Sequence, residues 1–364
     1  HFSEKELEIQ FDQLKKQIVP ADKTIREQAE KHWGHVAKPL GSLGVLEEDI
    51  VRAAAAQGEE VPDFSKRALL IFCADNGVVE EGVSQTGQEV TAAVVSNMTR
   101  GRSCSCLMAV KVETDVFPID MGIACEVEHR GELHPLTERK IRRGTSNFTK
   151  AAAMTRQEVL TAILTGIDAV RVLKQQGYRL SAVGEMGIGN TTTSSAVASV
   201  LLQKDPELVT GAGAGLDSAG LKRKTEAIRS GIGLHHPDPM DGMEVLQKVG
   251  GFDLAAMAGA FLGGAIYHVP VVIDGVIAAA AAAAAGRIAP AATDYMLAAH
   301  VSAEPASIWL LDLIGVTPAI QAGLRLGEGT GALALFPLLD MALSIYRDMD
   351  TFAEMEIEEY KPLV

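Results

Sequence analysis

The stretch "LSAVGEMGIGNTT", residues 180–192, decides the fold because it joins three kinds of local structure in one short run. Residues 180–184 are mostly apolar and have the composition of a strand that is covered on both faces. Gly187 and Gly189 allow a tight turn, and Thr191 stands near the start of an expected helix. A strand, a turn and a helix in this order are typical of an α/β fold.

The same alternation continues along most of the chain. We expect strands at 68–73, 115–119, 180–184 and 269–274, and a further segment of the alternation that ends at His300. We expect helices at about 90–98 and 156–176, one from about 191 and one after Leu216. This alternation predicts a parallel sheet with helices on both faces.

The N-terminal region has a different pattern. Apolar residues at helical spacing run from Leu7 to Ile18 and end at Pro20, and Asp22 can cap a second helix. Two or three helices are therefore expected before the first strand. Because no internal repeat or Ser/Pro-rich linker divides the chain, we place a boundary near residue 65, where the strands begin.

The composition is that of a soluble globular protein. The 364 residues are 47% hydrophobic, which suffices for a sizeable core, and they carry a formal net charge of −14. This negative charge argues against a nucleic-acid surface, which needs Lys and Arg to neutralise phosphates. The most apolar stretch, 254–285, is interrupted by His268, Pro270 and Asp274, so it predicts a buried core and no membrane span.

Four cysteines stand at positions 73, 104, 106 and 125. They include one C-x-C pair but lack the second pair or the His spacing of a zinc site, so we expect reduced thiols. The N-terminal residues lack the charged and apolar regions of a secretion signal. We therefore expect a cytoplasmic protein.

Polar or glycine-rich turns follow four of the expected strand segments: "ADNG", "GEMGIGNTT", "IDG" and "HVSAEP". Because ligands bind at the carboxyl ends of parallel strands, these turns indicate one shared crevice. Polar side chains after the first strand fit a small-molecule pocket better than a metal loop; they are Asp75, Asn76, Glu80, Glu81, Ser84 and Gln88. A serine hydrolase is excluded because the chain has no G-x-S-x-G turn.

The turn "GEMGIGNTTT" has the features of an anion site. The amides of Gly187, Ile188 and Gly189 lead into a helix, with Asn190 or Thr191 near its cap. The turn lacks the Lys of a P-loop and does not match the dinucleotide fingerprint. From the residues alone, a phosphate cradle and an ordinary tight turn stay equally open.

A second glycine cluster, "TGAGAG" at 210–215, precedes four cations in an otherwise acidic protein: Lys222, Arg223, Lys224 and Arg229. One of these cations could close on a phosphate. A solvated basic helix face is the more common meaning of such a cluster.

A third cluster, "LRLGEGTGA" at 324–332, sets Glu328 between glycines before an apolar helix, as the first turn does with Glu185. Glycine allows a substrate to approach closely, and a carboxylate there can act as a general base. Burial would raise its pKa toward a useful range. A role at the helix N-terminus is the alternative, and the residues leave both open.

Seven motifs in this order resemble the nicotinate-nucleotide:dimethylbenzimidazole phosphoribosyltransferase family over about residues 30–340. They are "KPLGSLGVLE", "ADNGVVEEGVSQTGQEVT", "GEMGIGNTT", "TGAGAGLD", "GGFDLAAMAGA", "HVSAEP" and "LRLGEGTGA". Seven ordered motifs are far more specific than any single glycine loop. The resemblance therefore favours the anion-cradle and general-base interpretations.

The resemblance implies that an aromatic base, 5,6-dimethylbenzimidazole or a related lower ligand of cobamides, attacks C1′ of nicotinate mononucleotide. Nicotinate leaves, and an α-linked riboside phosphate forms with inversion. The resemblance further implies a homodimer and a Rossmann-like α/β fold with a smaller helical domain from both termini. The implied domains are 1–65, 66–335 and 336–364. No metal or cofactor is implied, because the leaving group is nicotinate.

The resemblance also assigns roles to matching residues. Glu328 would take the proton from the attacking base nitrogen, and Glu185 would steady the oxocarbenium-like ribose. The implied nucleotide and phosphate contacts are Gly187, Ile188, Gly189, Asn190, Thr191, Gly213, Lys224 and Ser302. The implied base contacts are Ser84, Gln88, Met186 and Leu326.

One departure leaves the base open. Many members of the family carry "DHG" and an aromatic-proline step, where this chain has residues 75–77, "DNG", and "SQTGQ". A relative that accepts phenol or p-cresol, sometimes as a heterodimer of homologous subunits, is therefore one alternative. A catalytically silent nucleotide-binding subunit is another, against which the presence of Glu185 and Glu328 argues.

Overall fold

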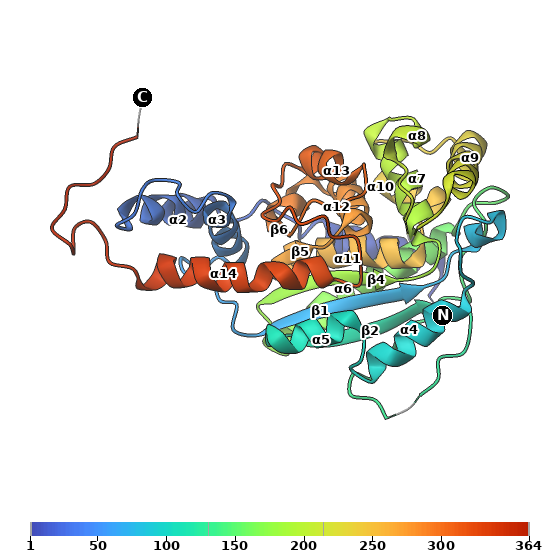
Figure 1. The fold of residues 1–364 in the computed structure, drawn as a ribbon, viewed down its shortest axis with the longest axis horizontal. Helices are drawn as coiled ribbons and strands as arrows, with labels where there is room; N and C mark the ends of the chain where they lie inside the picture. The colour runs from blue at the N-terminus through green and yellow to red at the C-terminus, as the bar shows by residue number, and fades with distance from the viewer. Residues whose placement is uncertain (1, 130, 214, 363–364) are drawn as a thin grey trace.

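The computed structural model describes residues 2–129, 131–213 and 215–362, so position 214 of the second glycine cluster lies outside the described residues. Six parallel strands form one sheet in the order β3-β2-β1-β4-β5-β6 (Figure 1). The strands are β1 Arg67–Ala74, β2 Asp115–Gly122, β3 Thr137–Glu138, β4 Leu180–Met186, β5 Val271–Ile273 and β6 Met296–Ala298. The predicted parallel sheet is confirmed.

Strand β1 lies at the centre of the sheet, and every one of its residues is buried. Leu70 and Phe72 face one core, which contains helices α6 (Arg156–Gln175), α11 (Phe252–Tyr267) and α12 (Val276–Ile288). Leu69 and Ile71 face the other, which contains α4 (Glu89–Thr99), α5 (Cys104–Lys111) and α14 (Thr330–Asp348). Because side chains alternate along a strand, a continuously apolar run supplies both cores.

The remaining helices connect and extend these layers. They are α1 Glu4–Lys15, α2 Lys23–His35, α3 Val45–Gln57, α7 Asn190–Leu202, α8 Pro206–Val209, α9 Ser218–His235, α10 Gly242–Val249 and α13 Ser307–Ile314. Two short 3-10 turns, Gly77–Glu81 and Pro290–Tyr295, complete the set for the described residues.

Helices from both ends of the chain meet beside the sheet. Figure 1 shows α2, α3 and the C-terminal part of α14 extending away from the strands. The ring of Trp33 on α2 packs edge-on against Tyr346 on α14, with 4.9 Å between the ring centroids. Helix α1 instead packs against α6 through the core that contains Leu7 and Phe11. The domain boundaries at 65 and 335 stay a prediction.

The apolar stretch 254–285 forms most of α11, then β5 and most of α12, and it is buried almost throughout. Its glycines and alanines let these elements pack closely. Across the described residues, no helix combines the length and apolar character that crossing a membrane requires.

Helices α6 and α11 touch backbone to backbone. A Cβ atom at Gly166 would overlap the carbonyl oxygen of Ala256, and one at Gly259 would overlap that of Ile163. This close approach fixes α11 against α6. Helix α11 starts beneath the carboxyl ends of the strands, and its first turn carries the buried Asp253.

We expect Gly166→Ala to lower the free energy of unfolding by about 2–3 kcal/mol, because neighbouring backbone must move to admit a methyl group. The matched control is Gly233→Ala in α9, where no atom lies within 4 Å of the added Cβ. That substitution should raise stability by about 0.5–1 kcal/mol, since alanine favours a helix. Urea unfolding of both variants measures the contrast, and equal effects would contradict the close packing.

Candidate active site

A cavity of about 310 Å³ lies at the carboxyl ends of β4, β5 and β6, beside the loop that follows β1. The strand order reverses between β1 and β4, so the cavity stands at the topological switch point of the sheet. Its volume suits a small molecule. Three of the four predicted turns, "GEMGIGNTT", "IDG" and "HVSAEP", contribute residues to the cavity, whereas "ADNG" does not line it and residues 83–86 of the same loop do.

Nearly all of the predicted site residues line this cavity. They are Ser84, Glu185, Met186, Gly187, Ile188, Gly189, Asn190, Thr191, Gly213, Ser302, Leu326 and Glu328. Gln88 and Lys224 are outside this lining set. The side-chain amide of Gln88 donates to the carbonyl oxygen of Asn76 at 3.4 Å.

The polar loop after β1 supports the cavity mostly from behind. Ser84 lines it, whereas the buried Asp75 accepts a hydrogen bond from the Thr91 hydroxyl at 2.6 Å. Burial raises the pKa of Asp75 to about 6. The Thr91 hydroxyl in turn accepts from the amide of Ile188 at 3.1 Å, and the side chain of Asn76 donates to the Ile188 carbonyl. These bonds fasten the glycine turn to the end of β1.

The glycine turn has less freedom than its sequence suggests. A Cβ at Gly187 would overlap the carbonyl oxygen of Ala74, so only glycine fits there. The amide of Asn190 donates to the Gly187 carbonyl at 3.2 Å, and the Ile188 amide is held by Thr91. The main-chain amides of Ile188 and Asn190, two residues predicted to contact the phosphate, therefore donate hydrogen bonds that stabilise the turn.

Lys224 on α9 is fully buried behind the turn. Its Nζ atom donates to the Thr191 hydroxyl at 3.1 Å and to the Gly211 carbonyl at 3.0 Å. Burial lowers the pKa of Lys224 to about 8. Lys222 and Arg223 on the same helix are exposed, so the basic cluster contains both a buried cation and a solvated face.

Glu185 is the penultimate residue of β4, and only 6% of its surface is exposed. One side-chain amide group, Nδ2 of Asn190, donates to Glu185 and also to Asp253, the latter at 3.0 Å. A Cβ at Gly327 would lie 2.8 Å from Oε1 of Glu185, so the opposite loop needs glycine there. Burial, with the charges of Asp253 and Asp274, raises the pKa of Glu185 well above its ordinary value.

Glu328 stands in an unusual turn. Gly327, Glu328 and Gly329 all have left-handed backbone, with φ of 87°, 58° and 77°. Within the described residues, the buried Oε2 atom of Glu328 has no hydrogen-bond partner. Burial raises its pKa, while the amide and hydroxyl of Ser105 oppose that rise. An acceptor atom without a partner beside the cavity suits proton removal.

Sequence reasoning missed several lining residues, namely Asp274, His300, Glu304 and Arg325. Asp274 directly follows β5 and His300 is the second residue after β6, and this position was the available signal for a role. Glu304 and Arg325 lie in the predicted motifs "HVSAEP" and "LRLGEGTGA", but no role was assigned to either side chain. Among the described residues, no three His, Cys, Asp or Glu side chains come together as metal ligands.

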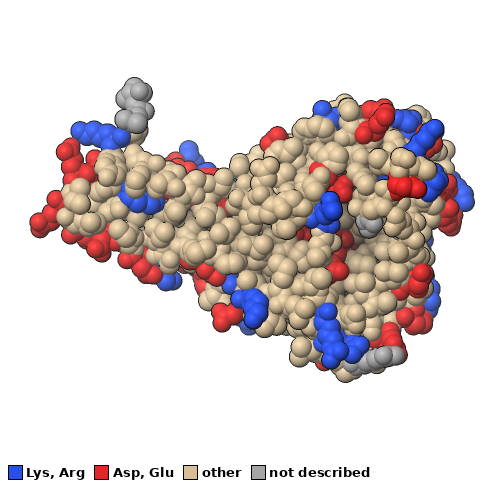
Figure 2. Space-filling view, in the orientation of Figure 1, with Lys and Arg blue, Asp and Glu red and all other residues tan. Residues whose placement is uncertain are grey.

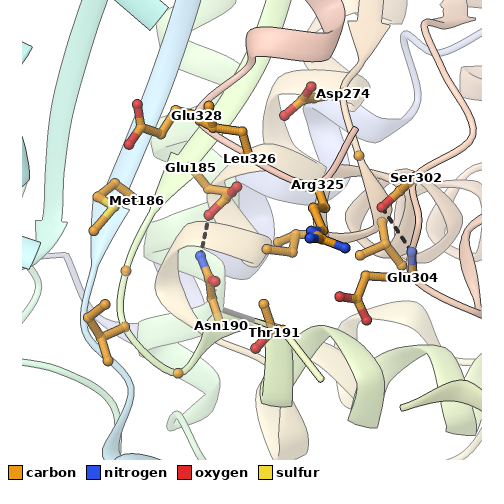
Figure 3. Close-up of a pocket in the computed structure, with 18 of the residues that line it drawn as sticks. Glu185, Met186, Asn190, Thr191, Asp274, Ser302, Glu304, Arg325, Leu326 and Glu328 are labelled. Atoms are coloured by element: carbon orange, nitrogen blue, oxygen red, sulfur yellow. Dashed lines mark hydrogen bonds between the residues drawn. The ribbon is translucent and has the colours of Figure 1, made fainter. Parts of the chain in front are cut away.

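The cavity has two sides. Figure 3 shows Glu328 and Met186 on one side of Glu185, and Arg325, Ser302 and Glu304 on the other. Thr191 lies on the second side, close to the start of α7. A ligand that passes Glu185 would therefore meet an acid and apolar groups at one end and a cation with polar groups at the other.

The outer surface around this cavity is mixed in charge. Figure 2 shows acidic and basic side chains interspersed over the face that it presents, with no continuous basic area. The phosphates of a polyanion need many cations close together, and the face in Figure 2 does not present such a group. The cations that matter for a small anion are therefore those near the cavity.

Comparisons with known proteins agree with this arrangement. A family model described as phosphoribosyltransferase matches residues 18–357. The nicotinate-nucleotide–dimethylbenzimidazole phosphoribosyltransferase of Ruminiclostridium cellulolyticum is 44% identical over 93% of this chain and 95% of its own length. The enzyme of the same name from Geobacter metallireducens is 40% identical, over 94% of this chain and 96% of its own length.

A solved structure extends the comparison to three dimensions. The crystal structure of the enzyme of this name from Thermus thermophilus superposes with a TM-score of 0.86 at 37% identity. The alignment covers 93% of this chain and all of that one. The resemblance drawn from the seven motifs is confirmed, and the chain belongs to the nicotinate-nucleotide–dimethylbenzimidazole phosphoribosyltransferase family.

Proposed function

We propose that the protein transfers the phosphoribosyl group of nicotinate mononucleotide to 5,6-dimethylbenzimidazole. A ring nitrogen of the base forms a bond to C1′ with its lone pair. The bond from C1′ to the pyridinium nitrogen breaks, and its electron pair neutralises the ring as nicotinate leaves. The base loses its N–H proton to Glu328, and the product is α-ribazole 5′-phosphate, the nucleotide of a cobamide lower ligand.

The observation that carries this proposal is the pair of acids on facing glycine turns. Glu185 and Glu328 both line the cavity, and the Gly327 position lies against Glu185. Glu185 faces the ribose in our proposal, where its charge steadies the cation that develops at C1′. Glu328 stands on the acceptor side, where it takes the proton of the base.

The donor phosphate is placed on the side of Thr191, Ser302 and Arg325. Helix α7 begins there, and the N-terminus of a helix favours an anion. We include Gly189 and Gly213 as positions of close approach, with Lys224 behind them. Asn190 and Ile188 hold the turn in shape, and Gly187 lets it pack against β1.

The acceptor base is placed beside Met186 and Leu326, with Ser84 at the edge of the cavity. Leu326 is 53% exposed, so an aromatic base would cover apolar surface there. Gln88 supports this side through its contact with Asn76. Such a pocket is mostly apolar with a few polar groups, as expected for a planar heterocycle.

The test is a chromatographic assay of the purified protein with nicotinate mononucleotide and either 5,6-dimethylbenzimidazole or phenol. We expect nicotinate release coupled to formation of the benzimidazole riboside phosphate. If product forms with phenol and not with 5,6-dimethylbenzimidazole, the acceptor is a phenol and the proposed acceptor is wrong. Nucleotide binding without either product would reject the transferase proposal for this chain.

We also propose that the protein works as a homodimer in the cytoplasm, on small molecules and not on nucleic acid. The support is the family resemblance together with the acidic net charge of −14. Light scattering of the purified protein tests the dimer. Co-purification with a homologous second subunit would favour a heterodimer instead.

We expect donor binding to weaken as the pH rises above about 8. Burial holds the pKa of Lys224 at about 8, so its ammonium is present below that pH and lost above it. The attraction for the donor phosphate is lost with it, and the dissociation constant should rise by about tenfold in all before it levels off. Calorimetric titration between pH 7 and 9.5 measures this slope.

Two variants of α9 serve as controls for that slope. Lys224→Met should bind the donor about tenfold more weakly at pH 7 and show little further dependence on pH. Lys222→Met, which removes an exposed cation from the same helix, should behave as the unaltered protein. A slope that survives in Lys224→Met would assign the effect to another group.

A further inference from the structure

Asp274 ties the end of β5 to the turn that carries Glu328. It is 4% exposed and lines the cavity. Its Oδ2 atom accepts from the amide of Gly329 at 3.0 Å, and its Oδ1 atom accepts from the amide of Ala332 at 3.2 Å. Gly329 directly follows Glu328, and Ala332 lies in the first turn of α14. One carboxylate therefore holds two amides at the start of this helix.

The turn itself needs such support. A left-handed conformation at a residue with a side chain costs about 1–3 kcal/mol and persists only where the surroundings determine it. Glu328 adopts it between two glycines that do the same. The turn also rests on the sheet: a Cβ at Gly184 would lie 2.6 Å from the carbonyl carbon of Glu328, and one at Gly329 would overlap Leu69.

His300 completes the surroundings of Asp274. Its Nε2 atom lies 3.6 Å from Oδ1 of Asp274, and the ring is 3% exposed. Both side chains pack closely against α14, because a Cβ at Gly331 would overlap the His300 ring and would lie 2.7 Å from Oδ1 of Asp274. The Asp274 carboxylate is therefore confined on one side by His300 and on the other by the start of α14.

We propose that Asp274 is the positioning residue of Glu328, fixing the turn so that the Glu328 carboxylate meets the proton that the acceptor base releases. The inference rests on the proposed transfer to a benzimidazole. Asp274 acts on proton removal through the main chain at Gly329, and it takes no proton itself. Substitution of Asp274 should therefore slow transfer to acceptors that must give a proton to Glu328. Transfer to acceptors that release no proton should keep its rate.

The experiment compares two acceptors, of which only one carries an N–H proton that must be removed during transfer. The first, 5,6-dimethylbenzimidazole, must lose an N–H proton when its other nitrogen attacks. The second is imidazopyridine, a fused bicycle of similar shape that keeps one basic ring nitrogen and has a bridgehead nitrogen in place of the N–H group. Its attack on C1′ gives a cationic product and requires no base.

For Asp274→Asn we expect kcat with 5,6-dimethylbenzimidazole to fall about 100-fold, because a positioned general base contributes about 10²–10⁴-fold. The rate with imidazopyridine and the dissociation constant of nicotinate mononucleotide should each change less than about threefold. Glu328→Gln should give the same pattern with a larger loss. Equal losses with both acceptors, or no loss with either, would overturn the inference.

A second variant covers the case in which Asp274→Asn does not fold, which circular dichroism reveals. Asp274→Glu keeps a charged acceptor but displaces it by one methylene, so it should show the same contrast between acceptors with about tenfold loss. If the unaltered protein transfers nothing to 5,6-dimethylbenzimidazole, the proposed function and this inference fail together. If the unaltered protein is active and both variants keep full activity, only the inference fails.

Discussion

Glu328→Gln lowers kcat for transfer to 5,6-dimethylbenzimidazole by about 10²–10⁴-fold in our expectation, the range that general base catalysis supplies. Glutamine keeps the shape of the side chain but cannot accept the proton. The carboxylate is suited to that task because Oε2 has no partner in the described structure and burial raises its pKa. Steady-state kinetics of nicotinate release measures the loss.

Donor binding separates this effect from damage to the pocket. The dissociation constant of nicotinate mononucleotide should stay within about threefold, since the proposed phosphate contacts, Thr191, Ser302 and Arg325, lie on the opposite side of Glu185 (Figure 3). A variant with unchanged turnover would refute the assigned role. A variant that no longer binds the donor would show that Glu328 holds the structure of the cavity.

Glu185→Gln should lower kcat by about 10²–10³-fold, comparable to the loss of one group that stabilises transition-state charge. Glutamine keeps the size and shape of the side chain, so the donor should still bind. The loss appears in kcat, because a neutral amide cannot stabilise the positive charge that develops at C1′ as a carboxylate does.

The choice of acceptor distinguishes the two glutamates. If Glu185 acts on the ribose as proposed, its substitution should slow transfer to 5,6-dimethylbenzimidazole and transfer to imidazopyridine equally. Glu304→Gln is the matched control, since it neutralises another acid that lines the cavity but lies on the side proposed for the phosphate. It should retain kcat. A loss in Glu185→Gln that is confined to the benzimidazole would place Glu185 on the proton path instead.

The fold could be predicted well wherever a strand gave a long apolar run. Strands β1, β2 and β4 coincide with the expected runs, because strands buried on both faces leave a continuous signal. Strand β3, Thr137–Glu138, was missed, since two exposed residues at the sheet edge give no apolar pattern. The helices before the first strand were also expected, though not that α1 packs against α6.

The site could be predicted in part, because glycine turns show where a chain comes close to a ligand. They do not show which main-chain amides already donate hydrogen bonds within the protein. The Ile188 amide donates to the Thr91 hydroxyl, 97 positions away in the sequence. Nor does a cluster of cations show which one is buried, as Lys224 is. The bonds of Asp274 to α14 depend on tertiary structure, so no local pattern could reveal them.

The two-sided cavity has a consequence for turnover. In the proposed reaction the acceptor base meets one side of Glu185 and the donor phosphate meets the other, whereas α-ribazole 5′-phosphate joins both halves in a single molecule. Joining two fragments makes the second contact intramolecular, which raises the effective concentration of each half. We therefore expect the product to dissociate more slowly than either substrate and to inhibit the enzyme as it accumulates. A non-hydrolysable analogue that spans both sides would be a bisubstrate inhibitor.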